Sequence, residues 1–151
     1  MTCFNHSGMK INNNNMLILK HLRANARKNF SQISRETNIP VTTVFDNYQK
    51  LSKSKIITKH TSFLDFRKLG LFYRSFVFIK TKDKKELLSY LDEHKSVNSI
   101  FRISNYDYMI DAVFPTIKEF HMFLDELQGF NIQKLEAHDV IEHMKKEEFL
   151  S

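Results

Sequence analysis

The sequence predicts an α+β fold in two parts, a winged helix-turn-helix unit followed by a unit with the order βαββαβ. Three observations predict it. Two short amphipathic helices are separated by a turn at 38–40, lysine and arginine are concentrated in the first 70 residues, and strand and helix patterns alternate after residue 72. The 151 residues, 42% of them hydrophobic, are enough to build two small cores.

Charge divides the chain near residue 70. Residues 1–70 hold 12 Lys and Arg against 3 Asp and Glu, whereas residues 71–151 hold 11 against 14. A basic half that coincides with a helix-turn-helix pattern is typical of phosphate binding, while evenly spread charge would indicate only solubility. The front half is therefore expected to bind nucleic acid.

Cysteine content and hydropathy narrow the class of protein. The single Cys3 cannot form an internal disulfide and no CxxC metal spacing is present, which favours a reducing, cytoplasmic setting. No apolar run approaches the roughly 20 residues of a membrane helix, and the first residues lack a signal peptide's apolar core. Because no paired catalytic carboxylates, nucleophile group or phosphate loop stand out, we expect no catalytic site, metal or cofactor.

The first part is predicted to start with a flexible segment at 1–10 and a supporting helix at about 14–24. Ile18, Leu19 and Leu22 give that helix an apolar stripe. This helix is expected to pack against the two that follow.

Local signals define the turn between the next two helices. Asn29 and Gln32 have the spacing of a capping box at the start of a short helix. Asn38 suits a left-handed turn, and Pro40 suits the start of another helix. Two helices joined so tightly are the layout of a helix-turn-helix reader of DNA.

The second of these helices carries the candidate DNA-contacting face. Val41, Val44, Tyr48 and Leu51 recur at helical spacing and are expected to face the core. The opposite face is either a solvated surface or a surface that enters the major groove, and the coincident positive charge favours the groove. The outward residues are Thr42, Thr43, Asp46, Gln49, Lys50 and Lys53.

A stretch of high β-propensity at 56–64 follows and is predicted to form a hairpin, the wing. Lys59 on this wing is a candidate phosphate contact, although a solvated lysine is the alternative. The DNA-binding domain is thus expected to span 11–64, with a linker at 65–71.

The second part opens with a strand at 72–81 whose two alternating sets of residues are both apolar. Phe76 and Phe78 point to one face, and Val77 and Ile79 to the other, so both faces need a cover. The elements after it are a helix begun by Asp83 and Glu86, strands at 97–103 and 108–114, a turn at 104–107, a helix begun by the capping box of Thr116 and Glu119 and stopped at Gly129, a strand at 132–141 and a loose tail at 144–151.

The order βαββαβ is the ferredoxin-like arrangement, an antiparallel sheet with both helices on one face. The other face remains apolar, and the simplest cover is a second copy related by two-fold symmetry. Residues 72–143 are therefore expected to form a dimerisation domain that presents two DNA-binding units together.

With these elements placed, the chain resembles the Lrp/AsnC (leucine-responsive, feast/famine) family of transcription regulators over about 11–143. The resemblance rests on the order and spacing of weak signs. They are Ile18-Leu19 with Leu22, Arg27, Thr43-Val44, Leu51, Ile56-Ile57, Asp65, Leu69-Gly70 and Tyr106-Asp107.

The resemblance implies a dimer, or a larger even-numbered assembly, that binds promoter DNA through the winged helix. It adds Arg27 and Asn47 to the candidate DNA-binding residues, Asn47 standing where an Arg is usual and Lys55 where a Gly closes the recognition helix. An amide cannot replace a guanidinium in contacts with phosphate or guanine, so Asn47 is expected to change the affinity for DNA or the preferred DNA site.

The resemblance also implies a C-terminal RAM domain that senses an amino acid at a subunit interface. The candidate effector site is the turn of Ser104, Asn105, Tyr106 and Asp107, and a plain β-turn is the alternative. Ser104 stands where a Gly is usual, so its side chain either occludes the ligand space or supplies a hydroxyl.

The expected function is sequence-specific transcriptional regulation by a dimer, with an amino acid or related small molecule as candidate effector. The first alternative is an architectural or helper DNA-binding protein of the same fold without an effector, which Ser104 favours. The remote alternative is an enzyme similar to siroheme decarboxylases, but none of the seven His has metal-ligand spacing.

Overall fold

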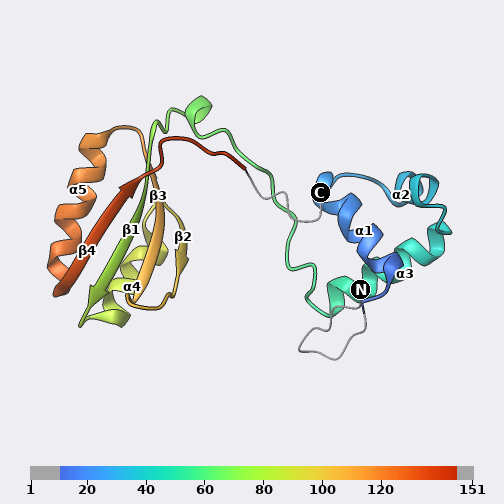
Figure 1. Ribbon diagram of the computed structural model, residues 1–151, viewed down its shortest axis with the longest axis horizontal. Coiled ribbons are helices and arrows are strands. Elements are labelled where there is room, and N and C mark those ends of the chain that lie inside the picture. Colours follow the sequence, from blue (N-terminus) through green and yellow to red (C-terminus); the bar gives the residue numbers. More distant parts are fainter. Residues whose placement is uncertain (1–10, 146–151) are drawn as a thin grey trace. The chain divides into compact units, whose positions relative to one another are not determined.

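The structure, a computed structural model, describes residues 11–145 (Figure 1). The described chain forms two compact units, one ending at Phe63 and the other spanning Leu64–Met144. The predicted flexible segment at 1–10, and most of the predicted tail at 144–151, lie outside the described residues.

The first unit consists of three helices, α1 (Asn13–Ala24), α2 (Phe30–Thr37) and α3 (Val41–Lys53). Burial of one apolar stripe from each helix, at roughly 1.5–3 kcal/mol per large side chain, holds them together. The core consists of Ile18, Leu22, Ile33, Ile39, Val44 and Leu51.

Both local signals around α2 are confirmed. Asn29 Oδ1 accepts a hydrogen bond from the Gln32 N–H at 2.8 Å, and Gln32 Oε1 accepts one from the Asn29 N–H at 3.1 Å. At the other end Asn38 has a φ of 57°, the left-handed conformation that reverses the chain toward α3. The helix-turn-helix therefore forms where the sequence places it.

The predicted hairpin at 56–64 is wrong, since no strand lies between α3 and residue 72. The N–H groups of Ile56 and Ile57 both donate to the Leu51 carbonyl, at 3.0 and 3.2 Å, and their side chains pack on the helical core. They close the end of α3 instead of pairing with a strand. No tight-turn dipeptide follows to reverse the chain and align two strands.

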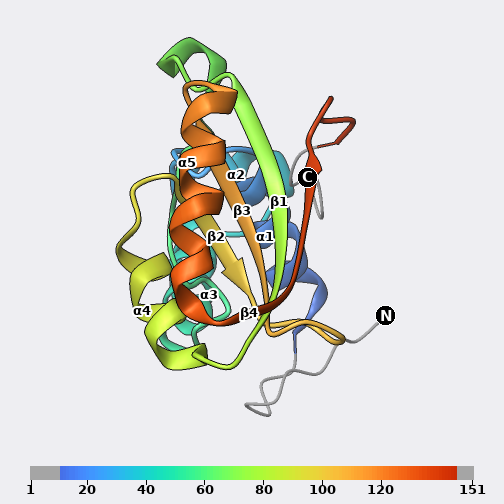
Figure 2. The ribbon, with the colours of Figure 1, turned by 90° about the vertical axis from the view of Figure 1, so that its left-hand side faces the viewer.

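The second unit is a four-stranded antiparallel sheet in the order β2-β3-β1-β4, with α4 (Lys84–Glu93) and α5 (Ile117–Leu127) on one face (Figure 2). This confirms the predicted ferredoxin-like arrangement. The strands are β1 (Tyr73–Thr81), β2 (Val97–Phe101), β3 (Tyr108–Phe114) and β4 (Ile132–Asp139), with short 3₁₀ turns η1 (Arg67–Leu69) and η2 (Gln128–Phe130).

The alternation along β1 divides the sheet into a covered and an open face. Val77 and Ile79 are fully buried beneath the helices, whereas Phe76 and Phe78 lie on the other face and are half-buried. The covered core also contains Leu87, Leu91, Ile110, Ala112, Phe114, Phe120, Phe123 and Leu127.

Both helices of this unit start where predicted, but only one of the two predicted capping boxes forms. The capping box of Thr116 and Glu119 forms as predicted. Asp83 precedes α4, but its side chain makes no cap bond and instead accepts from Asn131 Nδ2 at 2.5 Å. The carboxylate thus ties the start of α4 to the start of β4, a contact that no local spacing in the sequence signals.

Helix α5 ends at Leu127, just before Gly129 as predicted, although the left-handed residue of the following turn is Asn131, with a φ of 44°, because η2 adds one tight turn before β4 begins. One C-terminal boundary differs from prediction. The last strand ends at Asp139 rather than residue 141, although the Val140 N–H still donates to the Arg74 carbonyl at 2.9 Å.

Lys55, just beyond α3, also lies in the left-handed region, with a φ of 57°. This conformation costs an L-residue with a Cβ roughly 1–2 kcal/mol, and glycine avoids that cost. Glycine also gives the unfolded chain more conformational freedom, which offsets about 0.5–1 kcal/mol of the gain. We therefore predict that Lys55→Gly raises the unfolding free energy of the first unit by about 0.5–1 kcal/mol, measured by urea denaturation followed by circular dichroism.

The matched control is Asn38→Gly, at the other left-handed position among residues 11–63. Asparagine tolerates this conformation, so the gain there is expected to be smaller. A Lys55→Gly protein less stable than the parent would contradict the assigned strain.

Candidate nucleic-acid interface

The rotation of α3 about its own axis is fixed by two side chains. Val44 and Leu51, seven residues apart, are fully buried in the core of the first unit. Pro40 directly precedes the helix, with a φ of −52° that suits a helix start and a carbonyl that accepts from the Val44 N–H at 3.0 Å. The side opposite Val44 and Leu51 must therefore face away from the core.

The structure places most of the predicted DNA-contacting residues on this outward side. Those in α3 with exposed side chains are Thr42, Asp46, Lys50 and Lys53, and those half-buried at its flanks are Thr43, Asn47 and Gln49. Arg27 and Lys59 are exposed outside α3. The inward placement of Val41 is wrong, because its side chain is 44% exposed and lies outside the core cluster.

The unit that carries α3 is strongly basic. Between residues 11 and 63 the chain has nine Lys and Arg and only two carboxylates, Glu36 and Asp46. Lys28 Nζ donates to Glu36 Oε2, and this bond is the main reason why the pKa of Glu36 is lowered. With one of its two acids held as an ion pair, the unit presents an excess of positive charge to a polyanion.

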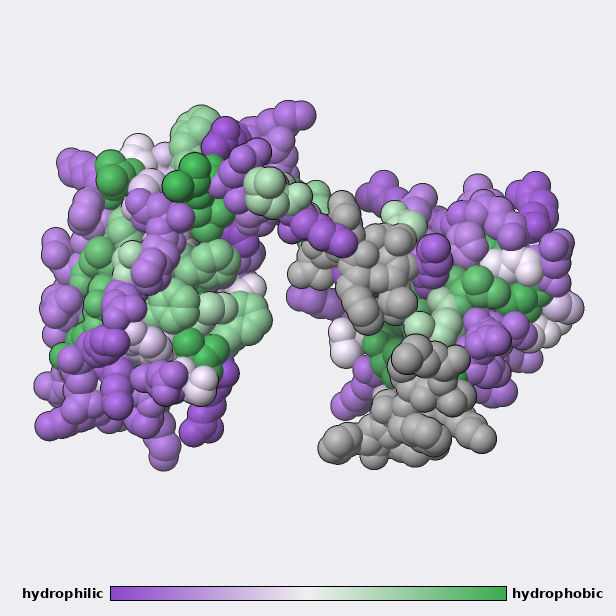
Figure 3. Space-filling model, viewed as in Figure 1, coloured by the Kyte–Doolittle hydropathy of each residue, from purple (hydrophilic) through white to green (hydrophobic). Residues whose placement is uncertain are grey.

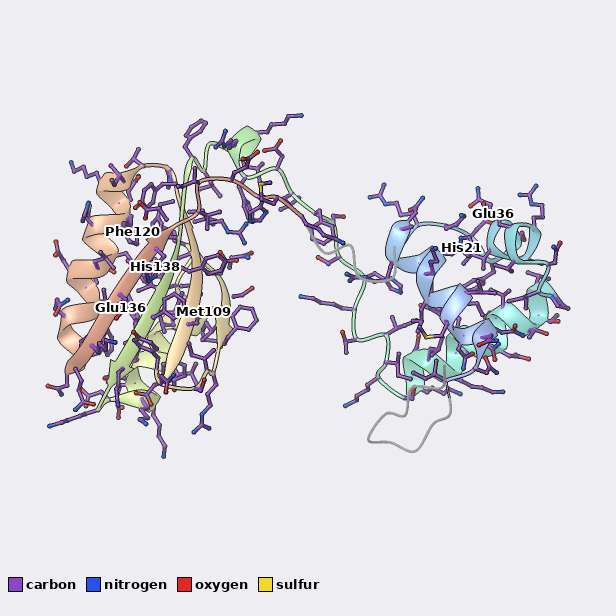
Figure 4. The ribbon with its side chains drawn as sticks, viewed as in Figure 1. His21, Glu36, Met109, Phe120, Glu136 and His138 are labelled. Carbon is purple, nitrogen blue, oxygen red and sulfur yellow. The ribbon has the colours of Figure 1, made fainter. Side chains whose placement is uncertain are left out.

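The same ion pair joins the first two helices across the loop between them. His21 Nδ1 lies 3.2 Å from Lys28 Nζ and 3.4 Å from Glu36 Oε2, so one charged cluster connects α1, the loop and α2 (Figure 4). This connection supports α2, against which α3 packs.

The candidate effector turn lies in the second unit, between β2 and β3. Ser104 and Asn105 are exposed, and the left-handed residue is Asn105, with a φ of 69°. The Tyr106 hydroxyl accepts from Lys134 Nζ at 2.8 Å, and its ring centroid lies 5.6 Å from that of Phe78. The turn is thus split into an exposed tip and a base held by neighbouring strands.

Asp107 holds the base of this turn in place. Its Oδ2 accepts from the Thr81 N–H at 3.0 Å and its Oδ1 lies 2.5 Å from Lys84 Nζ. The hydrogen bond from Lys84 is the largest cause of the lowered pKa of Asp107. The carboxylate already has partners within the chain, so its first role is to fix the turn to α4.

A surface hollow of about 510 Å³ borders Asp107. It combines cations, carboxylates and an apolar lining, a mixture that suits a small zwitterion. Apart from Asp107, its residues could not be grouped from the sequence, because they come from separate elements. They are Lys84, Leu88, Asp92, Ile100, Arg102, Asp107 and Tyr108.

Within residues 11–145 no three His, Cys, Asp or Glu side chains gather closely enough to hold a metal ion. No helix in the same range has the length and apolar character needed to cross a membrane.

Known proteins match this chain over both of its units. A family described as winged helix-turn-helix DNA-binding matches residues 11–58. The HTH-type transcriptional regulator Ptr1 of Methanocaldococcus jannaschii is 30% identical over 112 residues, 72% of this chain and 76% of that protein.

Solved structures match over both units. LrpC of B. subtilis superposes with a TM-score of 0.86 at 20% identity, covering 91% of this chain and 99% of that one. A transcriptional regulator of Neisseria meningitidis in complex with L-Met gives 0.81 at 20% identity, covering 89% and 92%.

A basic helix-turn-helix unit joined to a ferredoxin-like unit, with regulators as relatives, defines a DNA-binding transcriptional regulator. The chain belongs to the Lrp/AsnC family of HTH-type transcriptional regulators. The family predicted from the sequence is therefore confirmed.

Proposed function

We propose that this regulator binds promoter DNA in a sequence-specific manner through the outward side of α3. The observation that supports this most directly is that burial of Val44 and Leu51 turns a polar and basic set of side chains outward on the most basic part of the chain. Threonine and glutamine suit base edges, and lysine suits phosphates. The proposed contacts are Arg27, Thr42, Thr43, Asp46, Asn47, Gln49, Lys50, Lys53 and Lys59.

In this proposal the two parts of the chain divide the work. Residues 11–64 bind DNA, 65–71 link, and 72–143 join two copies and receive the effector. The protein acts by binding and not by catalysis. It works in the compartment that holds the DNA, and the single cysteine favours the cytoplasm as that compartment.

The open face of the sheet is the proposed surface for the second copy. Its centre carries apolar side chains from β1, β2 and β3, namely Phe76, Phe78, Phe101 and Met109. Edge strand β4 adds Lys134, Glu136 and His138 on the same face, with Glu136 opposite Phe78 and His138 opposite Phe76 (Figure 4). An apolar centre with a polar margin is the usual anatomy of a protein interface, and Figure 3 shows apolar surface on this unit.

A largely buried ion pair lies on the same face. Arg74 Nε donates to Asp111 Oδ1 and Arg74 Nη2 donates to Asp111 Oδ2, each at 2.6 Å. The Asp111 side chain is only 5% exposed. Asn98 Nδ2 adds a third bond at 2.6 Å, and the guanidinium lies 5.8 Å from the Phe76 ring centroid. Because the pair is satisfied within one chain, a second copy can cover it without leaving a charge unpaired.

The proposed effector is an amino acid or a related small molecule at the turn of residues 104–107. The hollow beside Asp107 offers cations for a carboxylate, carboxylates for an amine and an apolar lining for a side chain. The Neisseria regulator of the same fold was solved in complex with L-Met, which supports an amino acid as the effector. The effector-independent alternative keeps the support of Ser104 and of the bonds that already engage Asp107.

For the DNA face, we predict that Lys50→Ala weakens binding and lowers the slope of log affinity against log salt by about one, because one phosphate contact is lost. The measurement is a titration of labelled promoter DNA at several salt concentrations. Lys118→Ala, an exposed lysine on α5, is the control and should leave both quantities unchanged. Equal affinity of the Lys50→Ala and parent proteins would show that this side of α3 does not face DNA.

For the open sheet face, we predict that Met109→Asp converts a dimer into a monomer, because the interface would bury a carboxylate without a partner. Light scattering should give twice the 18.0 kDa of one chain for the parent and the mass of one chain for the variant. Met122→Asp is the matched control, since Met122 is 52% exposed on α5. A parent protein that is a monomer at micromolar concentration would refute the proposed interface.

For the effector, we predict that one amino acid raises the melting temperature of the protein and that Arg102→Ala abolishes the rise. A ligand at one hundred times its Kd adds about 2.7 kcal/mol to the unfolding free energy. Arg67→Ala, exposed on η1, controls for loss of charge in the same unit. No response to any of the twenty amino acids would favour the effector-independent alternative.

A further inference from the structure

Two large apolar side chains on α3 are exposed to solvent. Val41 is 44% exposed and Phe45 is 47% exposed, and both lie outside the cluster that forms the core of the first unit. Single exposed apolar residues are common, but these two follow each other at a spacing of four, which places them on one row of the helix.

The row continues into a polar side chain. Gln49 follows Phe45 at the same spacing, so Val41, Phe45 and Gln49 run along α3 beside the row that holds Thr42, Asp46 and Lys50. Val41 and Phe45 occupy the N-terminal half of the helix, the half that reaches base edges when a recognition helix lies in the major groove.

The Phe45 ring is also restrained. Its centroid lies 5.8 Å from that of Phe30 in an edge-to-face arrangement, and Phe30 in turn lies 5.0 Å from Tyr48. Such aromatic contacts favour a defined ring orientation. The ring is therefore held by α2 while about half of it stays in solvent.

We propose that Val41 and Phe45 read the C5-methyl groups of thymines in the major groove, with Gln49 contacting the adenine edge of the same or a neighbouring A·T pair. The thymine methyl is the apolar group that a base pair presents in this groove, and the amide of glutamine fits adenine N6 and N7. The proposal rests on the proposed orientation of α3 toward DNA, and it adds the base type that this helix selects.

Charge supports DNA as the occupant of this patch. The unit around it has nine Lys and Arg against two carboxylates, and Lys50 and Lys53 are exposed on the same helix. An apolar patch with such a basic surround is matched by thymine methyls between phosphates, whereas an apolar protein partner would leave the surrounding cations unmatched.

The test replaces thymine by uracil, which keeps the hydrogen-bonding groups and lacks only the methyl. Duplexes are first selected from a random pool with the full chain. They are then resynthesised with deoxyuridine at each thymine of the protected segment, the stretch of DNA that the bound protein covers. We expect about fourfold weaker binding for each contacted methyl, and no change for deoxyuridine outside the protected segment.

Variants assign the effect to the two side chains. In Phe45→Ala, thymine and uracil duplexes should bind with affinities closer to each other, whereas Leu17→Ala, at a residue 41% exposed on α1, should keep the difference seen with the parent protein. If Phe45→Ala does not fold, as judged by circular dichroism, Val41→Ala makes the same comparison.

The outcomes separate this proposal from the one on which it rests. Binding that is equally strong with thymine and uracil, or a uracil penalty that persists in both Phe45→Ala and Val41→Ala, overturns methyl reading while the DNA-contacting face stands. If no duplex is bound at all, the DNA-contacting face and the methyl reading both fall.

Discussion

The burial of Val44 and Leu51 is the constraint on which the rest of the first unit depends. Two fully buried side chains seven residues apart leave α3 one rotation about its axis, and that rotation decides which residues meet a ligand. The capping box before α2 and the left-handed Asn38 set the entry of α3, and Ile56 and Ile57 close its end. Core packing thus determines the chemistry of a surface that makes no contribution to the core.

The second unit contains a sheet with two apolar faces but only one layer of helices to cover them. Val77 and Ile79 are covered by α4 and α5, while Phe76 and Phe78 on the same strand are not. A regulator with one recognition helix per chain gains affinity and spacing selectivity if this open face joins two copies. The largely buried pair of Arg74 and Asp111 shows that the face combines apolar and satisfied polar groups within a single chain.

What the sequence predicted correctly was local or periodic. The Asn29 and Thr116 capping boxes, the Asn38 turn and the alternation of β1 each depend on residues a few positions apart, so spacing alone identifies them. The failures involve distant partners or competing contacts. Asp83 binds Asn131, which lies 48 positions away, and Ile56 and Ile57 return to the helical core instead of starting a strand of a hairpin. The hollow beside Asp107 needs α4, β2 and β3 packed together, and Val41 matched the core periodicity but lies outside the core.

The central claim is that α3 of two joined chains enters DNA at a fixed separation. Hydroxyl-radical footprinting of the selected duplex with the full chain tests it most directly. We expect two protected segments whose centres lie about 10–10.5 base pairs, or a multiple of that, apart, with two chains bound. One protected segment with a single chain bound would contradict it.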